Sequence, residues 1–220
     1  MKIYAIVPVK SLDHSKSRLA TILNNSERCE LSNLLLHNTV VCLEKISEIS
    51  EILVVASDRR VEQIVKNYNA KFIKEEKDNG VNSAVAIADH YSLEHGADST
   101  LVIPQDLPLL RPNDISIICK EGEIYKKCVL ICPSLRFDGT NALLRKPVLS
   151  MGTAYDNHSF AMHLRTARDL GAVTKIFLFQ SIMIDIDGID DVKELVNGPY
   201  RSNDITIFLR SKLKYKLNII

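Results

Sequence analysis

The sequence lacks the features of a membrane protein, a disulfide-bonded protein or a nucleic-acid-binding protein. No apolar run approaches the length of a membrane span, and the short apolar segment at the N-terminus gives way to charge at Lys10. Its five cysteines are odd in number and include no CxxC pair, so neither disulfides nor a zinc site is predicted. Lys and Arg together number 28 and Asp and Glu 27, which argues against a surface that binds nucleic acid through its phosphates. We therefore expect a cytoplasmic protein that contacts neither nucleic acid nor membrane.

The composition is that of a globular protein with one domain. Apolar residues make up 46% of the 220 residues and charged residues 25%, and this length is sufficient to bury a large core. There is no internal repeat, no low-complexity segment and no linker rich in proline or serine. We expect a single domain over residues 1–220, in which 201–220 form a C-terminal extension.

Short β-branched segments alternate with longer segments of helical periodicity. The expected strands are residues 3–9, 52–56, 101–104, 129–132, 175–179 and 183–186. The expected helices are about 25–45, then 60–68, 83–94, 112–120, 159–170 and 190–196. This alternation predicts an α/β three-layer sandwich with a mostly parallel, Rossmann-like sheet flanked by helices. Residues 210–217 alternate between polar and apolar and predict a final half-buried strand. In such a fold, ligands bind beyond the carboxyl ends of the strands.

A cationic loop follows the first expected strand. That strand ends at Pro8, and Lys10, Lys16 and Arg18 come within the next ten residues. A loop in this place could surround a triphosphate and oppose its charge. It has no glycine, so it is not a P-loop. Taken alone, these residues fit a solvated charged loop slightly better.

Carboxylates follow two other expected strands. Asp106 stands between Pro104 and Pro108, which stiffen the backbone, just beyond the strand at 101–104. Asp185 and Asp187 are two apart, so in an extended chain their side chains point the same way. Carboxylates so placed are suited to Mg²⁺, which binds one or two of them together with phosphate oxygens. The alternative for Asp106 is a turn residue, and a DxD pattern alone is weak evidence.

Small polar residues lie at several predicted element boundaries. Gly80 and Asn82 precede a helix, where free backbone N–H groups could meet a ligand. Thr140, Asn141 and Ser159 could similarly hold a phosphate or a carboxylate. Ordinary loop-to-helix junctions are the alternative in each case. His158 and His163 are five residues apart and do not share one helical face, so we do not expect them to bind a metal.

Taken in order, these segments resemble the 2-phospho-L-lactate guanylyltransferase family of deazaflavin coenzyme F420 biosynthesis. The resemblance runs from Ile3 to about Val196 and falls within the nucleotidyltransferase-like relatives of the GT-A glycosyltransferases. The segments that carry it are PVK with KSRL at 8–10 and 16–19, GVN at 80–82, PQDLP at 104–108, GTNAL at 139–143 and DID at 185–187.

The resemblance implies transfer of GMP from GTP to 2-phospho-L-lactate, with release of pyrophosphate, by a homodimer that uses Mg²⁺. It implies that the catalytic residues are Lys10, Lys16, Arg18 and Asp106. The nucleotide would be bound by Pro8, Lys10, Lys16, Arg18, Gly80 and Asn82. The phosphorylated acid would be bound by Thr140, Asn141 and Ser159, and Mg²⁺ by Asp106, Asp185 and Asp187.

One segment departs from the family pattern. Residues 155–160 read YDNHSF, where the family has a glycine-rich stretch resembling FGPGSF. The acceptor therefore stays open among 2-phospholactate, phosphoenolpyruvate and a phosphoglycerate. Other open readings are a cytidylyl or molybdopterin guanylyl transferase, a GT-A glycosyltransferase and a nucleotide-binding module without catalysis.

Overall fold

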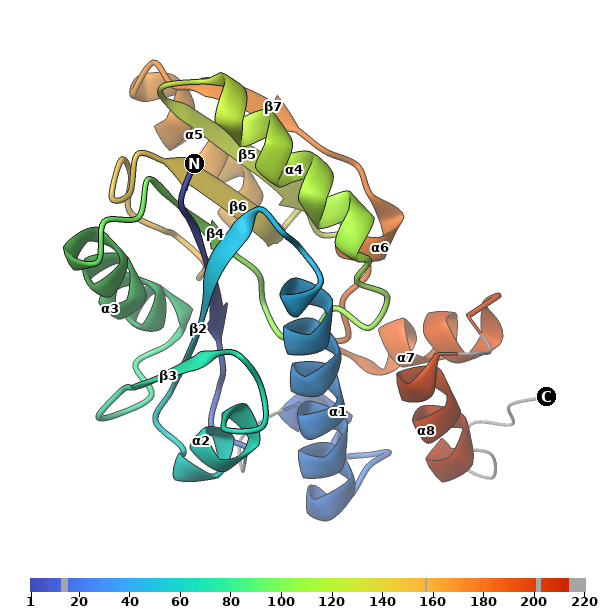
Figure 1. Cartoon of the computed structure of the whole chain (residues 1–220). Coiled ribbons are helices and arrows are strands. Elements are labelled where there is room, and N and C mark those ends of the chain that lie inside the picture. The colour runs from blue at the N-terminus through green and yellow to red at the C-terminus, as the bar shows by residue number, and fades with distance from the viewer. Residues whose placement is uncertain (13–15, 157, 201–202, 214–220) are drawn as a thin grey trace.

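The chain folds around one mixed β-sheet (Figure 1). A computed structural model describes residues 1–12, 16–156, 158–200 and 203–213. Its strands are β1 (Ile3–Pro8), β2 (Ile49–Ala56), β3 (Lys71–Lys74), β4 (Ser99–Val102), β5 (Cys128–Pro133), β6 (Thr140–Lys146) and β7 (Val173–Ile176). They lie in the order β3-β2-β1-β4-β6-β5-β7. Only β6 is antiparallel to its neighbours, β4 and β5, so the sheet is mostly parallel as predicted.

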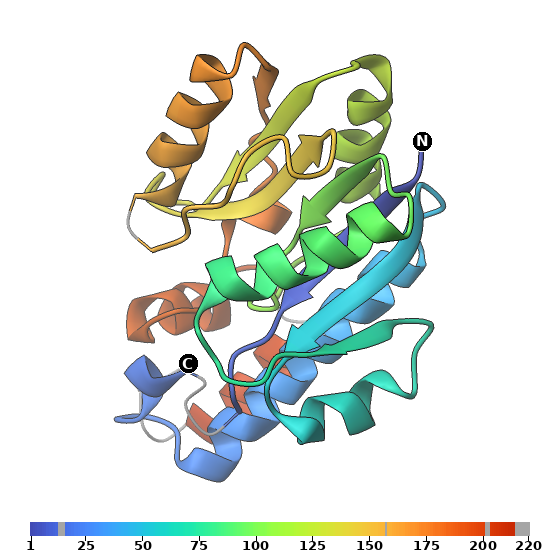
Figure 2. The ribbon, with the colours of Figure 1, turned by 90° about the vertical axis from the view of Figure 1, so that its left-hand side faces the viewer.

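Helices cover both faces of the sheet and make three layers (Figure 2). The helices are α1 (Asn25–Glu44), α2 (Arg59–Val65), α3 (Val81–Glu94), α4 (Pro112–Ile124), α5 (Ser159–Asp169), α6 (Gln180–Met183), α7 (Ile189–Asn197) and α8 (Asp204–Leu213), with a short 3-10 helix, η1 (Ser17–Leu19). Alternation along β1 divides the core: Ile3, Ala5 and Val7 pack towards α1, α2 and α4, whereas Tyr4 and Ile6 pack towards α3 and α5. The α/β fold class predicted from the sequence is therefore confirmed.

A third cluster of buried residues joins α7 and α8 to the sheet domain. Leu31 and Leu35 of α1 pack there with Leu195 of α7 and Leu209 of α8. Helix α1 begins as expected, because Asn24 and Glu27 form a capping box in which each side chain accepts from the other's backbone N–H at 2.9 Å. None of the described helices is long and apolar enough to cross a membrane.

Two strand predictions are wrong. Residues 183–186 are not a strand: Met183 ends α6, and the chain then runs without regular structure. Ile184 and Ile186 are apolar because they are buried, not because they pair in the sheet. Arg210–Leu213 of the predicted tail strand are helical, since Phe208, Leu209 and Leu213 bury one face of α8; residues 214–217 lie outside the described part of the chain. The strands β3 and β6 were not predicted, and β7 starts two residues before the expected strand.

A buried ion pair ties α3 to the antiparallel strand. Arg145 of β6 is 0% exposed and Asp89 of α3 is 2% exposed. The guanidinium donates to both carboxylate oxygens of Asp89, at 2.8 and 2.7 Å, and also to Thr100 Oγ1 and the Met151 carbonyl. Because Met151 begins the segment that leads to Tyr155, this pair anchors the loop that borders the cleft described below.

Removing one partner of this pair should be costly. Asp89→Ala leaves the Arg145 charge buried without a counter-ion, and we expect the free energy of unfolding to fall by about 3–5 kcal/mol. Asp169→Ala is the matched control, because its contacts with Arg165 and Arg168 are exposed and should contribute less than about 1 kcal/mol. Urea unfolding followed by circular dichroism measures both losses, and equal losses would contradict this role.

Candidate active site

A cleft of about 360 Å³ opens beyond the carboxyl ends of β1 and β4. The β1–α1 loop lines it with Lys10, Lys16 and Arg18, and the segment after β4 adds Asp106. Strand β6 and the segment between α6 and α7 complete it with Thr140, Asn141, Asp185 and Asp187. A second cavity of about 330 Å³ adjoins it, and both are lined by Arg18, Gly139, Tyr155, Ser159, Asp185 and Asp187. The structure thus has a cleft at the strand ends where the sequence predicts the site.

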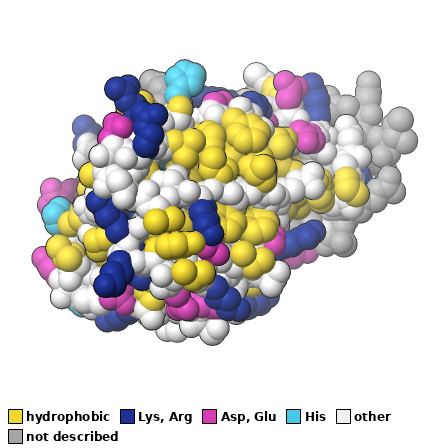
Figure 3. Space-filling model, turned by 90° about the horizontal axis from the view of Figure 1, so that it is seen from above, with side chains coloured by type: hydrophobic (Ala, Val, Ile, Leu, Met, Phe, Trp, Pro, Cys, Tyr) yellow, Lys and Arg dark blue, Asp and Glu magenta, His cyan; other side chains and the backbone are white. Residues whose placement is uncertain are grey.

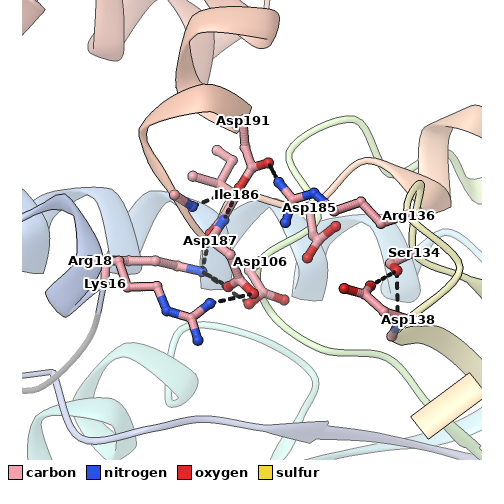
Figure 4. Close-up of polar contacts among 12 residues, drawn as sticks. Lys16, Arg18, Asp106, Ser134, Arg136, Asp138, Asp185, Ile186, Asp187 and Asp191 are labelled. Carbon is pink, nitrogen blue, oxygen red and sulfur yellow. Dashed lines mark hydrogen bonds and ion pairs between the residues drawn. The ribbon is translucent and has the colours of Figure 1, made fainter. Parts of the chain in front are cut away.

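Cations of the β1–α1 loop pair with two of the carboxylates (Figure 4). Lys16 Nζ lies 3.0 Å from Asp106 Oδ2 and 3.8 Å from Asp187 Oδ1, and it donates to the Ile186 carbonyl at 2.5 Å. Arg18 lies 3.7 Å from Asp187 Oδ2. The Lys16 side chain is only 7% exposed, and its backbone is left-handed with φ 51°. That conformation costs of order 1–3 kcal/mol, so the fold holds this lysine in the cleft at some expense of stability.

The third carboxylate has no cationic partner among the described residues. Burial, together with the negative charges of Asp106 and Asp187, raises the pKa of Asp185 to about 7. A hydrogen bond from Asn141 Nδ2 to Asp185 Oδ1 at 3.4 Å acts in the opposite direction. Asn141 also donates to the carbonyls of Ile182 and Met183, which places Asp185 against the end of β6. Asp185 is therefore the one carboxylate of this cleft that no lysine or arginine of the described residues pairs with.

The acidic residues fit a magnesium ion that arrives with its phosphate ligands. Within the described residues, no three acidic, histidine or cysteine side chains converge to form a ready-made metal cage. Mg²⁺ does not need one, because it keeps several waters and usually takes one or two carboxylates plus substrate phosphates. The donors are all hard oxygens, and Asp185 is left by the ion pairs of Lys16 and Arg18 with Asp106 and Asp187 without a cationic partner among the described residues.

Hydroxyl groups face the cleft on the side opposite the lysine. His163 is fully buried, and burial, with a smaller contribution from Arg145, lowers its pKa to about 4, so the imidazole is neutral. Its Nε2 accepts from the Ala154 N–H at 2.9 Å, so Nδ1 carries the proton and donates to Thr140 Oγ1 at 3.0 Å. Ser159 Oγ lies 3.2 Å from Thr140 Oγ1. The two hydroxyls share one hydrogen bond, which leaves one hydroxyl proton free to donate to a ligand in the cleft.

Asn82 bridges two segments at the rim of the cleft. Its Oδ1 accepts from the Tyr155 N–H at 2.9 Å, and its Nδ2 donates to Asp156 Oδ2 at 3.0 Å. Gly80, with φ 87°, is the N-cap of α3 and lines a smaller cavity beside Pro8 and Lys10. The structure therefore places Gly80 next to the cationic loop, whereas both ends of the Asn82 amide are used to hold the 155–156 segment.

Comparison with known proteins identifies the family. The model of the family described as guanylyl transferase CofC like matches residues 2–213. The chain belongs to the CofC-like guanylyl transferase family. A phosphoenolpyruvate guanylyltransferase of Rubrobacter xylanophilus is 31% identical over 196 residues, covering 89% of this chain and 94% of that protein. A 2-phospho-L-lactate guanylyltransferase of Methanothermobacter thermautotrophicus is 26% identical, covering 89% and 85%.

A solved structure supports the fold of this CofC-like chain. The protein, from Desulfovibrio desulfuricans G20, is described as a nucleotide-diphospho-sugar transferase. It superposes with a TM-score of 0.74 over 96% of this chain and 95% of its own, at 12% sequence identity. The predicted family resemblance and the predicted fold are both confirmed, and the chain is a guanylyltransferase.

The structure brings most of the predicted site residues of this CofC-like protein into one cleft. The residues that line it are Pro8, Lys10, Lys16, Arg18, Asp106, Thr140, Asn141, Ser159, Asp185 and Asp187. Gly80 lies beside it and Asn82 acts on the loop at its rim. Sequence reasoning missed His163, which was considered only as a metal ligand. It also missed Arg136, although this residue follows β5 and the strand-end rule directs attention to such positions.

The unbalanced charge of Asp185 gives a pH-dependent prediction. Because its pKa is raised from 3.8 to about 7 in the folded state, metal-free protein should lose stability as pH rises between about 4 and 7. Asp185→Asn removes this charge and should raise the melting temperature at pH 8, by about 2–4 °C per kcal/mol gained, but not at pH 4. Mg²⁺ should stabilise the wild type more than the variant. Differential scanning fluorimetry in EDTA and in Mg²⁺ measures both effects.

The control is Asp190→Asn, which changes the net charge equally at a side chain that is 89% exposed. It should leave the melting temperature nearly unchanged at both pH values. If Asp185→Asn behaved as Asp190→Asn does, the account of unbalanced charge in the cleft would be wrong.

Proposed function

We propose that this guanylyltransferase transfers GMP from GTP to the phosphate of a three-carbon phosphorylated acid, releases pyrophosphate, and uses Mg²⁺. The observation that carries the proposal is one cleft in which Lys10, Lys16 and Arg18 stand beside three carboxylates and the Thr140–Ser159 hydroxyls. Cations oppose the charge of a triphosphate, and carboxylates bind the magnesium that accompanies it. The family's role in making the deazaflavin coenzyme, as the resemblance implies, is part of the same proposal.

The names of the relatives support two acceptors. Relatives named phosphoenolpyruvate guanylyltransferase are 31% identical, as in Rubrobacter xylanophilus, or 34% identical, as in Roseiflexus sp.. The relative from Methanothermobacter that is named for 2-phospho-L-lactate is 26% identical. We therefore place phosphoenolpyruvate first, ahead of the 2-phospho-L-lactate expected from the resemblance. Both acceptors carry a phosphate ester and a carboxylate on the same carbon atom, so one site chemistry serves either.

The reaction needs no general base. A phosphate monoester has a second pKa near ~6 and is largely dianionic at neutral pH. One of its oxygens attacks the α-phosphorus of GTP, a new P–O bond forms, and the bond to the β-phosphate oxygen breaks as pyrophosphate leaves. Bound Mg²⁺ supplies screening of the charge on both substrates. The protein's part is to hold two anions in line against their repulsion.

Lys16 and Arg18 exchange partners in this proposal. In the structure they pair with Asp106 and Asp187, the residues that would hold the metal. Once those carboxylates bind a cation, both side chains are free to donate to the phosphates of the nucleotide. Before substrate binds, the carboxylates and the basic residues thus neutralise each other. After binding, the carboxylates would pair with the metal ion and the basic residues with the phosphates. The Thr140–Ser159 pair, fixed by His163, then donates its one free hydroxyl proton to the acceptor.

A homodimer stays a prediction that one surface supports. Strand β7 is at an edge of the sheet and leaves backbone groups on one side without a neighbouring strand. Ile124, Val173, Ile176 and Leu178 are exposed around it. Figure 3, viewed from above, shows hydrophobic side chains gathered on this face.

The proposed reaction is tested by pyrophosphate release. Purified protein is given Mg²⁺, each of the four nucleoside triphosphates, and each of three acceptors: phosphoenolpyruvate, 2-phospho-L-lactate and 3-phosphoglycerate. We expect release that requires both GTP and one acid. Asp106→Asn should reduce the rate at least 100-fold because it removes a charge from the metal site, whereas Asp190→Asn should keep it. Release with another triphosphate would overturn the donor, and consumption of a nucleotide sugar without pyrophosphate would identify a glycosyltransferase.

A further inference from the structure

The loop between β5 and β6 is rigidly built beside the second cavity. Ser134 Oγ donates to Asp138 Oδ1 at 2.7 Å and accepts from the Gly139 N–H at 2.9 Å. A Cβ on Gly139 would stand 3.2 Å from Ser134, so this turn has little room for another residue. Phe137 has φ 59°, and its ring packs edge-on against Phe160 of α5 with centroids 5.9 Å apart. The loop therefore presents Arg136, the residue just before Phe137, in a defined place.

Asp191 holds that arginine next to the acidic segment. One carboxylate oxygen of Asp191 accepts from the backbone N–H groups of Asp187 and Gly188, at 2.9 and 2.6 Å. The other oxygen pairs with Arg136 (Figure 4). One side chain thus fixes the backbone that carries Asp187 and also the guanidinium. The Asp191 contact engages one terminal nitrogen of Arg136, and no other contact of this guanidinium is found among the described residues.

The second cavity contains a positive charge that the first does not. Arg18 and Arg136 are the lysine or arginine residues that line it, and Arg18 also lines the main cleft. Its wall includes Ser159, the hydroxyl that faces the proposed acceptor, together with Asp185 and Asp187. An acid entering this cavity meets carboxylates on most sides, so its negative end can be held only where a cation is presented. Arg136 is the cation that the nucleotide does not already require.

We propose that Arg136 binds the carboxylate of the acceptor and so selects phosphate esters that carry an acid group. This inference rests on the proposed function. Guanidinium and carboxylate form paired N–H···O hydrogen bonds whose planar geometry a lysine does not reproduce. The acceptor then spans the cavity, with its phosphate towards Thr140, Ser159 and the metal-binding carboxylates and its acid group at Arg136. The selectivity resides in the β5–β6 loop, outside the segments that carry the family resemblance.

The test separates acceptor binding from nucleotide binding. Arg136→Met should raise KM for phosphoenolpyruvate roughly 10- to 100-fold, since it removes charge-assisted hydrogen bonds, and should leave KM for GTP and the melting temperature nearly unchanged. Arg136→Lys should recover part of the loss. The matched control is Arg165→Met, an exposed arginine on α5 whose change should alter neither KM. Isopropyl phosphate, which lacks the carboxylate, should be equally poor for the wild type and Arg136→Met.

Calorimetry keeps the inference distinct from the reaction itself. Phosphoenolpyruvate and 2-phospho-L-lactate are titrated into protein that holds Mg²⁺ and a GTP analogue with a methylene group between the α and β phosphorus atoms. Weaker binding to Arg136→Met than to Arg165→Met supports the inference even if no pyrophosphate forms with the wild type. Equal binding to both variants, or an equal rise in KM for isopropyl phosphate, overturns it while the proposed function stands. Loss of melting temperature without change in KM would make the Arg136–Asp191 pair structural only, and this too overturns it.

Discussion

The balance of charge at the carboxyl ends of the central strands is the constraint on which the rest of the site depends. Asp106 and Asp187 are neutralised by Lys16 and Arg18, whereas Asp185 has no cationic partner among the described residues, and its burial beside other carboxylates raises its pKa to about 7. Such a cluster is poor for stability, since like charges are held together at a partly buried place. It is well suited to receive a metal–triphosphate complex, which brings a divalent cation and several negative charges at once. The loss of stability in the protein without ligand and the capacity to bind a metal–triphosphate complex are two consequences of the same arrangement.

The antiparallel strand β6 adds a second set of side chains, the hydroxyl groups, next to the charged residues of the cleft. Because β6 runs against its neighbours, its first residues, Thr140 and Asn141, lie at the end of the sheet where β1 and β4 finish. Asn141 reaches Asp185 on the metal side, and Thr140 joins Ser159 and His163 on the hydroxyl side. Strand β6 is held in place by the buried Arg145–Asp89 pair, and Arg145 also donates a hydrogen bond to the Met151 carbonyl. The core thereby sets the separation between the proposed nucleotide and acceptor positions.

Much of this arrangement could be predicted from the sequence, and what was missed has physical reasons. The strand-end rule directed attention to the loop that carries Lys16 and to Asp106, because a residue just after an apolar run is placed by local pattern and fold class alone. Thr140 was selected only as a small polar residue at an element boundary, and Asp185 by its two-residue spacing from Asp187. Strand β6 was missed because it contains Arg145 near its end, and a buried arginine is stabilised there by Asp89, which is distant in the sequence. The 183–186 segment was taken for a strand because burial against a sheet end and pairing within a sheet produce the same apolar pattern. The role of His163 depends on Ala154 and Thr140, which no spacing rule connects to it.

The exchange of partners by Lys16 is the claim that connects the empty protein to the reaction. A crystal structure of the protein with Mg²⁺ and a GTP analogue that cannot be cleaved between its α and β phosphorus atoms tests it most directly. The account predicts that Lys16 Nζ leaves its position 3.0 Å from Asp106 and lies within about 3 Å of a phosphate oxygen, with density for a metal beside Asp106, Asp185 and Asp187. A bound nucleotide with Lys16 still paired to Asp106, and no metal at the three carboxylates, would contradict it.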